Sequence, residues 1–344
     1  MYPVVYTPAR FAELLGISSK ELLEKELRGI VPPARRNGKV RYYLPEDLSR
    51  YRTYLKIPSP IKSHRRQLFL NFKGGTGKSS LSASYGFRLA EMGIHTLLVD
   101  LDPQGHLTQC LGYDSHDGKT LYNALILKED IRDIIMKTIL PTLDLLPSNL
   151  SLSPIELALQ PLNAREFRLK KALKPIEKDY EVIVMDASPS MGLLNLNAIL
   201  AANDLIIPVL ADFLSYHGLK ILFETLATVE EDFSFTFDNI YILLNRYNRS
   251  HKICRRSREA LIKHYSKYLL KTTIGQDTKI AEASSDGKTI FEYAPNSRGA
   301  VDIQRVIGEI FKIRNLTGKR FSKHKKGMPS KAKSRLFANY AQRR

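Results

Sequence analysis

Short apolar runs recur along the chain from residue 68 onward, and polar or glycine-containing segments separate them. We expect a strand at each of six runs, namely residues 68–72, 96–100, 143–147, 182–186, 204–209 and 239–245. Helical stretches are expected between the runs, the first over residues 79–92. Short strands that alternate with helices predict an α/β fold, with a mostly parallel sheet and helices on both faces. Ligands in such folds bind at the carboxyl ends of the strands.

The first 56 residues follow a different pattern. A short helix is expected to begin at Thr7, and a second to cover residues 20–28. The Asn37-Gly38 pair between extended segments predicts a hairpin, and a third helix follows over residues 45–55. This order of elements is that of a winged helix-turn-helix domain.

We expect four parts in the chain. They are a small winged helix-turn-helix domain (1–56), a proline-containing linker (57–66), an α/β nucleotide-binding domain (67–318) and a basic disordered tail (319–344).

The formal net charge of +18 comes from the two ends of the chain. Residues 1–66 hold 14 Lys/Arg and 6 Asp/Glu, residues 319–344 hold 10 Lys/Arg and no acid, and the middle is balanced. Basic ends predict a polyanionic partner, either nucleic acid or an anionic membrane. The alternative for the tail is a solvated segment with no ligand.

Neither a long apolar run nor a signal-peptide pattern is found, so we expect a cytoplasmic protein. Cys110 and Cys254 are far apart and form no metal motif, and we expect both to be packing residues.

A glycine-rich segment follows the first predicted strand and opens the first predicted helix. That is the context of a phosphate-binding loop. Backbone N–H groups and the helix N-terminus would hold phosphate oxygens, Lys78 would neutralise the β- and γ-phosphates, and Ser79 would ligate Mg²⁺. The nucleotide-binding residues expected here are Lys73, Gly74, Gly75, Thr76, Gly77, Lys78, Ser79 and Ser80. We therefore predict ATP and Mg²⁺ as ligands.

Lys73 directly before Gly74 and Gly75 marks the deviant Walker A loop of the ParA/MinD class. Residues 67–315 resemble the ParA-type partition ATPases. In that class two subunits enclose two nucleotides, and the signature lysine reaches into the partner's site. The resemblance therefore implies an ATP-dependent homodimer in which Lys73 offsets phosphate charge across the interface.

Carboxylates follow two of the predicted strands. Asp100 and Asp102, with Pro103, Gln104 and Gly105, match an Asp-x-Asp-Pro-Gln-Gly motif of the class. The resemblance implies that Asp102 acts on the attacking water, as a catalytic residue beside Lys73 and Lys78. Asp100 is expected to support the metal shell or the switch, or to be merely second shell. Asp186 ends an apolar strand like the class's Walker B motif, and we expect it to hold Mg²⁺ through water.

Later motifs favour the ParA branch of the class over MinD. Asn245 and Arg246 follow the last predicted strand, where the class contacts adenine. Residues 279–288 and 296–300 follow ParA-type segments closely. The chain departs from the pattern at Gly275-Gln276, where Pro-Arg is usual, and at Tyr216-His217-Gly218, where Leu-Glu-Gly is usual.

Two groups of basic residues are candidate DNA contacts. Residues 1–56 resemble the DNA-binding end of MerR-type regulators, whose wing would present Arg35, Arg36, Lys39 and Arg41 to phosphates. The second group begins with a basic run after residue 245: Arg249, Lys252, Arg255, Arg256 and Arg258. It also includes Lys279, at a position where the class often carries a DNA-contacting arginine. ParA-type binding of this kind is nonspecific and falls with salt. For either group the alternative is a surface that does not touch DNA.

The resemblance implies an ATPase that binds DNA in its ATP state and segregates a plasmid, chromosome or other cargo with a ParB-like stimulator. One alternative is a regulator whose winged module binds an operator. Another is a membrane-positioning ATPase like MinD, which we disfavour because residues 335–340 make a poor amphipathic helix. A nitrogenase-like reductase is disfavoured because neither cysteine sits where a shared cluster could bind.

Overall fold

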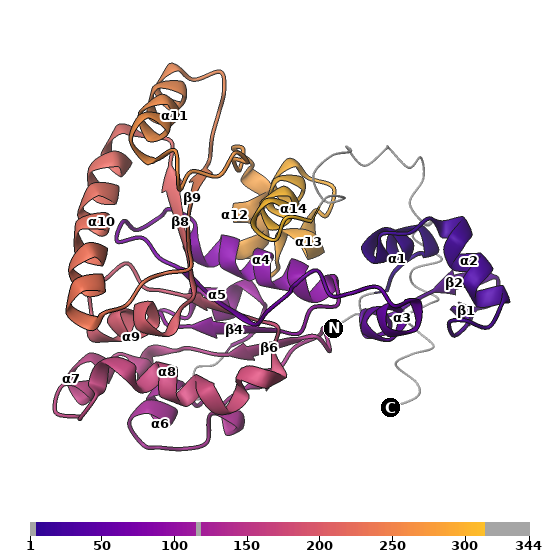
Figure 1. The fold of residues 1–344 in the computed structure, drawn as a ribbon, viewed down its shortest axis with the longest axis horizontal. Helices are drawn as coiled ribbons and strands as arrows, with labels where there is room; N and C mark the ends of the chain where they lie inside the picture. Colours follow the sequence, from indigo (N-terminus) through magenta and orange to yellow (C-terminus); the bar gives the residue numbers. More distant parts are fainter. Residues whose placement is uncertain (1–4, 115–117, 314–344) are drawn as a thin grey trace.

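A computed structural model describes residues 5–114 and 118–313 (Figure 1). Its main feature is a seven-stranded sheet with the strand order β5-β6-β4-β7-β3-β8-β9. Every neighbouring pair is parallel except β5 with β6, which is antiparallel. The expected α/β fold with a mostly parallel sheet is therefore confirmed. The predicted tail, residues 319–344, and the disfavoured membrane helix lie outside the described residues.

The strands of this sheet are β3 (Arg65–Phe69), β4 (Thr96–Asp100), β5 (Met136–Lys137), β6 (Leu143–Leu146), β7 (Val182–Asp186), β8 (Asp204–Leu210) and β9 (Asn239–Asn245). Six of them match predicted runs within a few residues, and the short edge strand β5 was not predicted. The prediction was most in error at β3, which lies three residues earlier than expected and takes Arg65 and Arg66 from the predicted linker. Arg65 is accommodated there because it pairs with Asp204 and Asp238.

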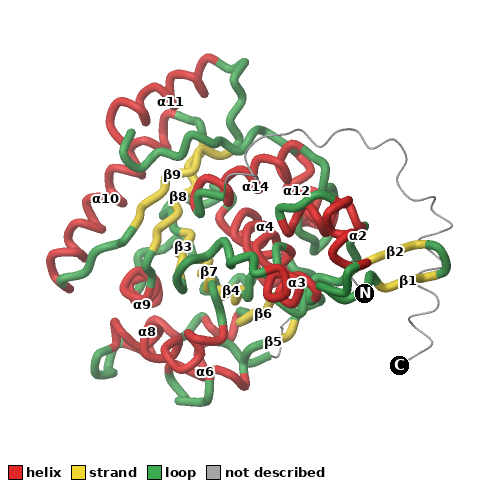
Figure 2. Tube along the Cα trace, turned by 45° about the vertical axis from the view of Figure 1, so that its right-hand side comes forward, coloured by secondary structure: helices red, strands yellow, loops and turns green. Residues whose placement is uncertain are grey.

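Helices cover both faces of the sheet (Figures 1 and 2). One face carries α4 (Lys78–Glu91), α5 (His106–Cys110), α12 (Thr278–Ser285), α13 (Ile290–Tyr293) and α14 (Arg298–Ile310). The other carries α6 (Leu121–Leu125), α7 (Ile155–Leu159), α8 (Arg168–Leu173), α9 (Leu193–Ala201), α10 (Phe213–Phe233) and α11 (Lys252–Tyr265). Successive strand residues alternate between the faces, so Leu98 packs in the first core while Leu97 and Val99 pack in the second.

The N-terminal segment has the predicted order of elements. Helices α1 (Pro8–Leu15) and α2 (Ser19–Leu27) precede the hairpin of β1 (Arg35–Asn37) and β2 (Val40–Tyr42), and α3 (Asp47–Leu55) follows. Thr7 and Ser18 cap the first two helices with their side-chain oxygens. Phe11 stacks on Tyr43, and Tyr51 meets both rings edge-on, which gives this segment an aromatic core of its own.

The sequence led us to expect a separate N-terminal domain. In the structure this N-terminal module, residues 5–56, packs against the α/β domain. Its apolar core is continuous with the core around α4. The Tyr6 hydroxyl donates to the Glu91 carbonyl at 3.3 Å. Leu48 lies against Gly93, where an added Cβ would come within 2.7 Å of the Leu48 Cβ. The module therefore sits at the far end of the helix that begins at the phosphate loop.

Candidate nucleotide site

The glycine-rich loop joins β3 to α4, and its backbone conformation depends on glycine at two positions. Gly75 and Gly77 have φ angles of 71° and 88°, in the left-handed region. At Gly77 the space is closed as well, because an added Cβ would lie 2.6 Å from the Asn245 side-chain nitrogen. The loop leads directly into α4, whose free N–H groups and dipole favour an anion.

Two asparagines hold this loop from behind. Asn245, at the end of β9, is buried and donates to the Thr76 carbonyl at 2.8 Å. Asn71 accepts from the Lys73 N–H at 2.9 Å and donates to the Pro208 carbonyl at 2.8 Å. Asn245 therefore supports the loop backbone, and its predicted contact with adenine stays a prediction. Asn71 was not predicted as a site residue, because a lone asparagine in an apolar run is a weak signal.

Lys78 and Asp186 converge beneath the loop. Both are buried, and neither carboxylate oxygen of Asp186 has a hydrogen-bond partner among the described residues. Burial raises the pKa of Asp186 to about 8, the charges of Asp100 and Asp102 act in the same direction, and Ser79 and Lys78 oppose them. Burial lowers the pKa of Lys78, while the negative charges of Asp186 and Asp102 raise it. Asp186 and the Ser79 hydroxyl beside it are therefore suited to hold Mg²⁺ through water, because a buried carboxylate usually needs a partner or a metal.

Asp100 lies opposite Asp186 in the sheet but is used differently. Its oxygens accept from the Asp102 N–H at 3.1 Å, the Thr108 N–H at 2.9 Å and the Thr108 hydroxyl at 2.8 Å. Burial raises the pKa of Asp100 to about 6, although these hydrogen bonds lower it. Asp100 therefore holds the turn that carries Asp102, and its predicted support of the metal site stays a prediction.

Asp102 begins that turn. Its carboxylate accepts from the Gln104 N–H at 2.9 Å, and its carbonyl accepts from the Gly105 N–H at 2.8 Å. Only 9% of Asp102 is exposed. The turn therefore fixes the carboxylate at the same sheet edge as Asp186, as the strand ends predicted.

Lys73 projects from the loop toward β8. Its ammonium lies 2.9 Å from one oxygen of Asp212 and 3.1 Å from the other. The two side chains are 30% and 40% exposed, so the pair lies at the surface. Asp212 was not predicted as a site residue, and only its place just after a strand end could have indicated it.

Further contacts tie α4 to the later helices. The Ser284 hydroxyl of α12 donates to the Ser80 hydroxyl at 2.9 Å. The departure at Gly275 also has a physical reason, because an added Cβ would lie 2.2 Å from the Arg298 side chain. Asp302 accepts from the Gly275 N–H at 3.0 Å, a hydrogen bond that the proline usual in the class could not donate.

The predicted DNA residues separate into two sets. Lys252, Arg255 and Arg256 are exposed on α11, and Arg258 is half-buried there. Arg249 is exposed in the preceding loop, next to the left-handed Arg246. Lys279 is exposed on α12, 3.9 Å from Glu282. Four of these six residues, Lys252, Arg255, Arg256 and Arg258, thus lie on one helix.

The wing of the N-terminal module is less basic than its sequence. Arg35 pairs with Asp47 at 3.3 Å, and Arg41 pairs with the buried carboxylate of Glu26. These two predicted phosphate contacts are therefore engaged inside the module. Arg36 and Lys39 are exposed at the hairpin and remain as candidates.

Among the described residues, no group of three or more His, Cys, Asp or Glu side chains is arranged to hold a metal ion. Both cysteines are buried and free. No helix within residues 5–114 and 118–313 is long and apolar enough to cross a membrane.

A glycine-rich loop between a strand and a buried helix, at the carboxyl edge of a mostly parallel sheet, defines a P-loop nucleotide-binding protein. A family model described as an AAA domain, AAA_31, matches residues 67–238. The cell division protein PomZ of Myxococcus xanthus is 50% identical over 307 residues, covering 89% of this chain and 92% of PomZ. The sporulation initiation inhibitor protein Soj of Bacillus subtilis is 36% identical, covering 67% of this chain and 91% of Soj. The chain belongs to this AAA_31 family of P-loop ATPases, of the ParA/MinD type.

A solved structure supports the same fold. Cobyrinic acid a,c-diamide synthase of Mycobacterium smegmatis, with a bound ATP analogue and magnesium, aligns with a TM-score of 0.60 and 28% identity. The alignment covers 70% of this chain and 91% of that one.

Proposed function

We propose that this protein is an ATP- and Mg²⁺-dependent ATPase that dimerises around its nucleotides and uses that cycle to position or segregate a cargo. The observation that carries the proposal is the set of charged groups at one sheet edge: Lys78 and the unpartnered Asp186 beneath the loop, with Lys73 at its rim. The similarity to PomZ and Soj supports the role in positioning or partition.

Each residue has a distinct task in this proposal. The loop N–H groups and Lys78 bind the phosphates, while Ser79 and Asp186 hold Mg²⁺. The ion, when bound, neutralises phosphate charge and orients the transferred group. Asp102 orients the attacking water, and Asp100 keeps Asp102 in place through the hydrogen bonds described above.

Lys73 would act on the partner's nucleotide. Its surface position at the loop supports this role, because a side chain at the rim can cross a dimer interface while one beneath the loop cannot. A cation delivered only by a second subunit would make hydrolysis depend on dimerisation.

The ATP-bound dimer would bind DNA without sequence preference, chiefly through the exposed cations of α11. In this proposal the protein is cytoplasmic and nucleoid-associated, and a ParB-like protein stimulates hydrolysis and so releases it. Arg36 and Lys39 of the N-terminal module would add phosphate contacts.

DNA retention tests this proposal. The full chain is passed over immobilised DNA with ATP, ADP or no nucleotide, each with Mg²⁺. We expect retention with ATP alone, its loss in Lys73→Ala, and no change in the exposed control Lys137→Ala. Equal retention in all three nucleotide states would contradict the proposal that ATP controls DNA binding.

A second candidate is an operator-binding regulator, favoured by the docking of the N-terminal module on α4, which would connect it to the nucleotide state. Footprinting on the protein's own upstream DNA tests it. Protection of a discrete site supports regulation, and equal affinity for scrambled DNA rejects it.

A further inference from the structure

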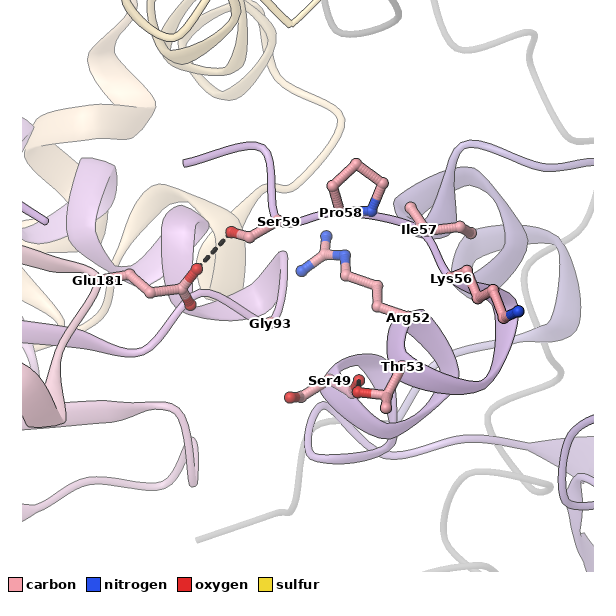
Figure 3. A pocket seen from close by; sticks show the side chains of 9 residues that line it. All are labelled: Ser49, Arg52, Thr53, Lys56, Ile57, Pro58, Ser59, Gly93 and Glu181. Atoms are coloured by element: carbon pink, nitrogen blue, oxygen red, sulfur yellow. Dashed lines mark hydrogen bonds between the residues drawn. The ribbon is translucent and has the colours of Figure 1, made fainter. Parts of the chain in front are cut away.

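The seam between the N-terminal module and the α/β domain contains an open groove of about 480 Å³. Figure 3 shows its walls, with α3 and the chain that follows it on one side and Gly93 and Glu181 on the other. The guanidinium of Arg52 projects from α3 into this space.

Arg52 is an unusual residue to find there. It is only 8% exposed, and within the described part of the chain its guanidinium donates a single hydrogen bond, to the Leu14 carbonyl at 3.4 Å. No carboxylate of the described residues pairs with it, and burial lowers the pKa of Arg52 while the charge of Glu181 opposes that change. A buried cation that no carboxylate contacts directly is costly, so an anion placed against the guanidinium would stabilise it.

Glu181 does not supply that anion. One of its oxygens accepts from the Ser59 hydroxyl, as Figure 3 shows, and the other accepts from the His95 N–H at 3.1 Å. Both oxygens therefore serve to fasten the linker and β4 rather than Arg52. The missing Cβ at Gly93 gives the guanidinium its room, because that atom would lie 3.2 Å from the nearer Arg52 nitrogen.

We infer that this groove binds a small molecule carrying a phosphate or carboxylate group, with the Arg52 guanidinium as its fork-shaped anchor. Arg52 offers two parallel N–H donors, which match either oxyanion. Lys56 is an exposed lining residue whose ammonium points away from the guanidinium in Figure 3, while Ile57 and Pro58 form an apolar wall for the rest of the ligand.

Such a ligand would join the module to the α/β domain. It would contact α3 and the linker on one side and the end of α4 on the other, so it would bind only when the two are docked. Its binding would therefore raise the thermal stability of the docked chain.

The test is calorimetric titration of the full chain. The phosphate loop is first filled with a saturating non-hydrolysable ATP analogue and Mg²⁺, so that anions cannot bind there. Pyrophosphate and citrate are then the two probes, which separate a phosphate source from a carboxylate source. Binding of either probe that depends on Arg52 supports the site, and binding of neither overturns it.

Arg52→Gln should weaken the affinity for whichever probe binds by at least about tenfold, as expected for the loss of a charge-assisted hydrogen bond. Arg50→Gln is the matched control, because Arg50 is exposed on the same helix and does not line the groove. Equal weakening by the two variants would overturn the assignment.

Glu181→Gln keeps the proposal falsifiable if Arg52→Gln does not fold. Removing the nearby negative charge should tighten probe binding about two- to tenfold. If Arg52 instead serves only to attract Glu181 across the seam, this variant lowers the melting temperature and leaves probe affinity unchanged, and the inference fails.

Discussion

The ammonium of Lys73 lies 2.9 Å from the Asp212 carboxylate of the same chain. The lysine assigned to the partner's nucleotide is thus held within its own subunit. Forming the active dimer would require it to leave Asp212, so the ion pair opposes dimerisation.

Asp212→Asn should favour the ATP-bound dimer, because it removes the carboxylate that competes for Lys73. Exposed ion pairs contribute about 0.2–1 kcal/mol each and a dimer releases two of them, so the gain in dimer affinity is up to about thirtyfold. Light scattering against protein concentration measures it, with Asp212→Glu as the charge-retaining control. A weaker dimer in Asp212→Asn would contradict this role.

Asp186 should make the nucleotide-free protein less stable as the pH rises. The folded chain keeps this proton up to about pH 8, whereas the unfolded chain loses it at about pH 4. Between these values the folded state binds more protons, so its free energy of unfolding falls with rising pH.

Asp186→Asn should therefore reduce the fall of the melting temperature with pH between about pH 6 and pH 8. This window lies above the range in which Asp100 titrates. Thermal melts with and without Mg²⁺-ATP measure the effect. The same variant should lose Mg²⁺-dependent ATP binding. An unchanged slope would mean that Asp186 is ionised in the folded chain.

Asn245→Ala should weaken ATP binding about fivefold, because it removes a hydrogen bond worth about 1 kcal/mol from the loop carbonyl of Thr76. Binding of inorganic triphosphate should weaken equally, since the effect acts on the loop. A loss confined to ATP would instead support the adenine contact first expected of Asn245. Asn248→Ala is the control, because its side chain bonds Gln276 and not the loop.

The pair Arg255→Ala and Arg256→Ala should reduce DNA retention in the ATP state. Each lost phosphate contact lowers the slope of log affinity against log salt by about 0.9, so the double variant should lose about 2. The double variant Lys170→Ala with Lys171→Ala, whose lysines are exposed on α8, controls for the loss of charge. Equal losses from the two double variants would show that net charge alone acts.

Much of the fold could be predicted from the sequence because its apolar runs are short and buried on both faces. The position of β3 could not, because Arg65 and Arg66 look like linker residues until Asp204 and Asp238 are brought beside Arg65. The docking of the N-terminal module was missed for a similar reason. A helix that buries Leu48 against Gly93 has no distinctive local pattern.

For the site, the loop and the three carboxylates were found because each follows a strand end. The roles expected of Asp102 and Asp186 stay predictions, whereas the hydrogen bonds that engage Asp100 could not be predicted because they depend on tertiary contacts. Asp100 accepts hydrogen bonds from Thr108, while the neighbouring Asp186 has none among the described residues. Both carboxylates are fully buried at the ends of neighbouring strands, and only their hydrogen bonds distinguish them.

Mixing two inactive variants tests the central claim most directly. Lys73→Ala subunits keep Asp102, and Asp102→Ala subunits keep Lys73, so a mixed dimer contains one site with both groups only if Lys73 acts across the interface. We predict that each variant alone shows almost no ATP turnover and that the mixture regains a clear fraction of the wild-type rate. A mixture as inactive as its components would contradict the account.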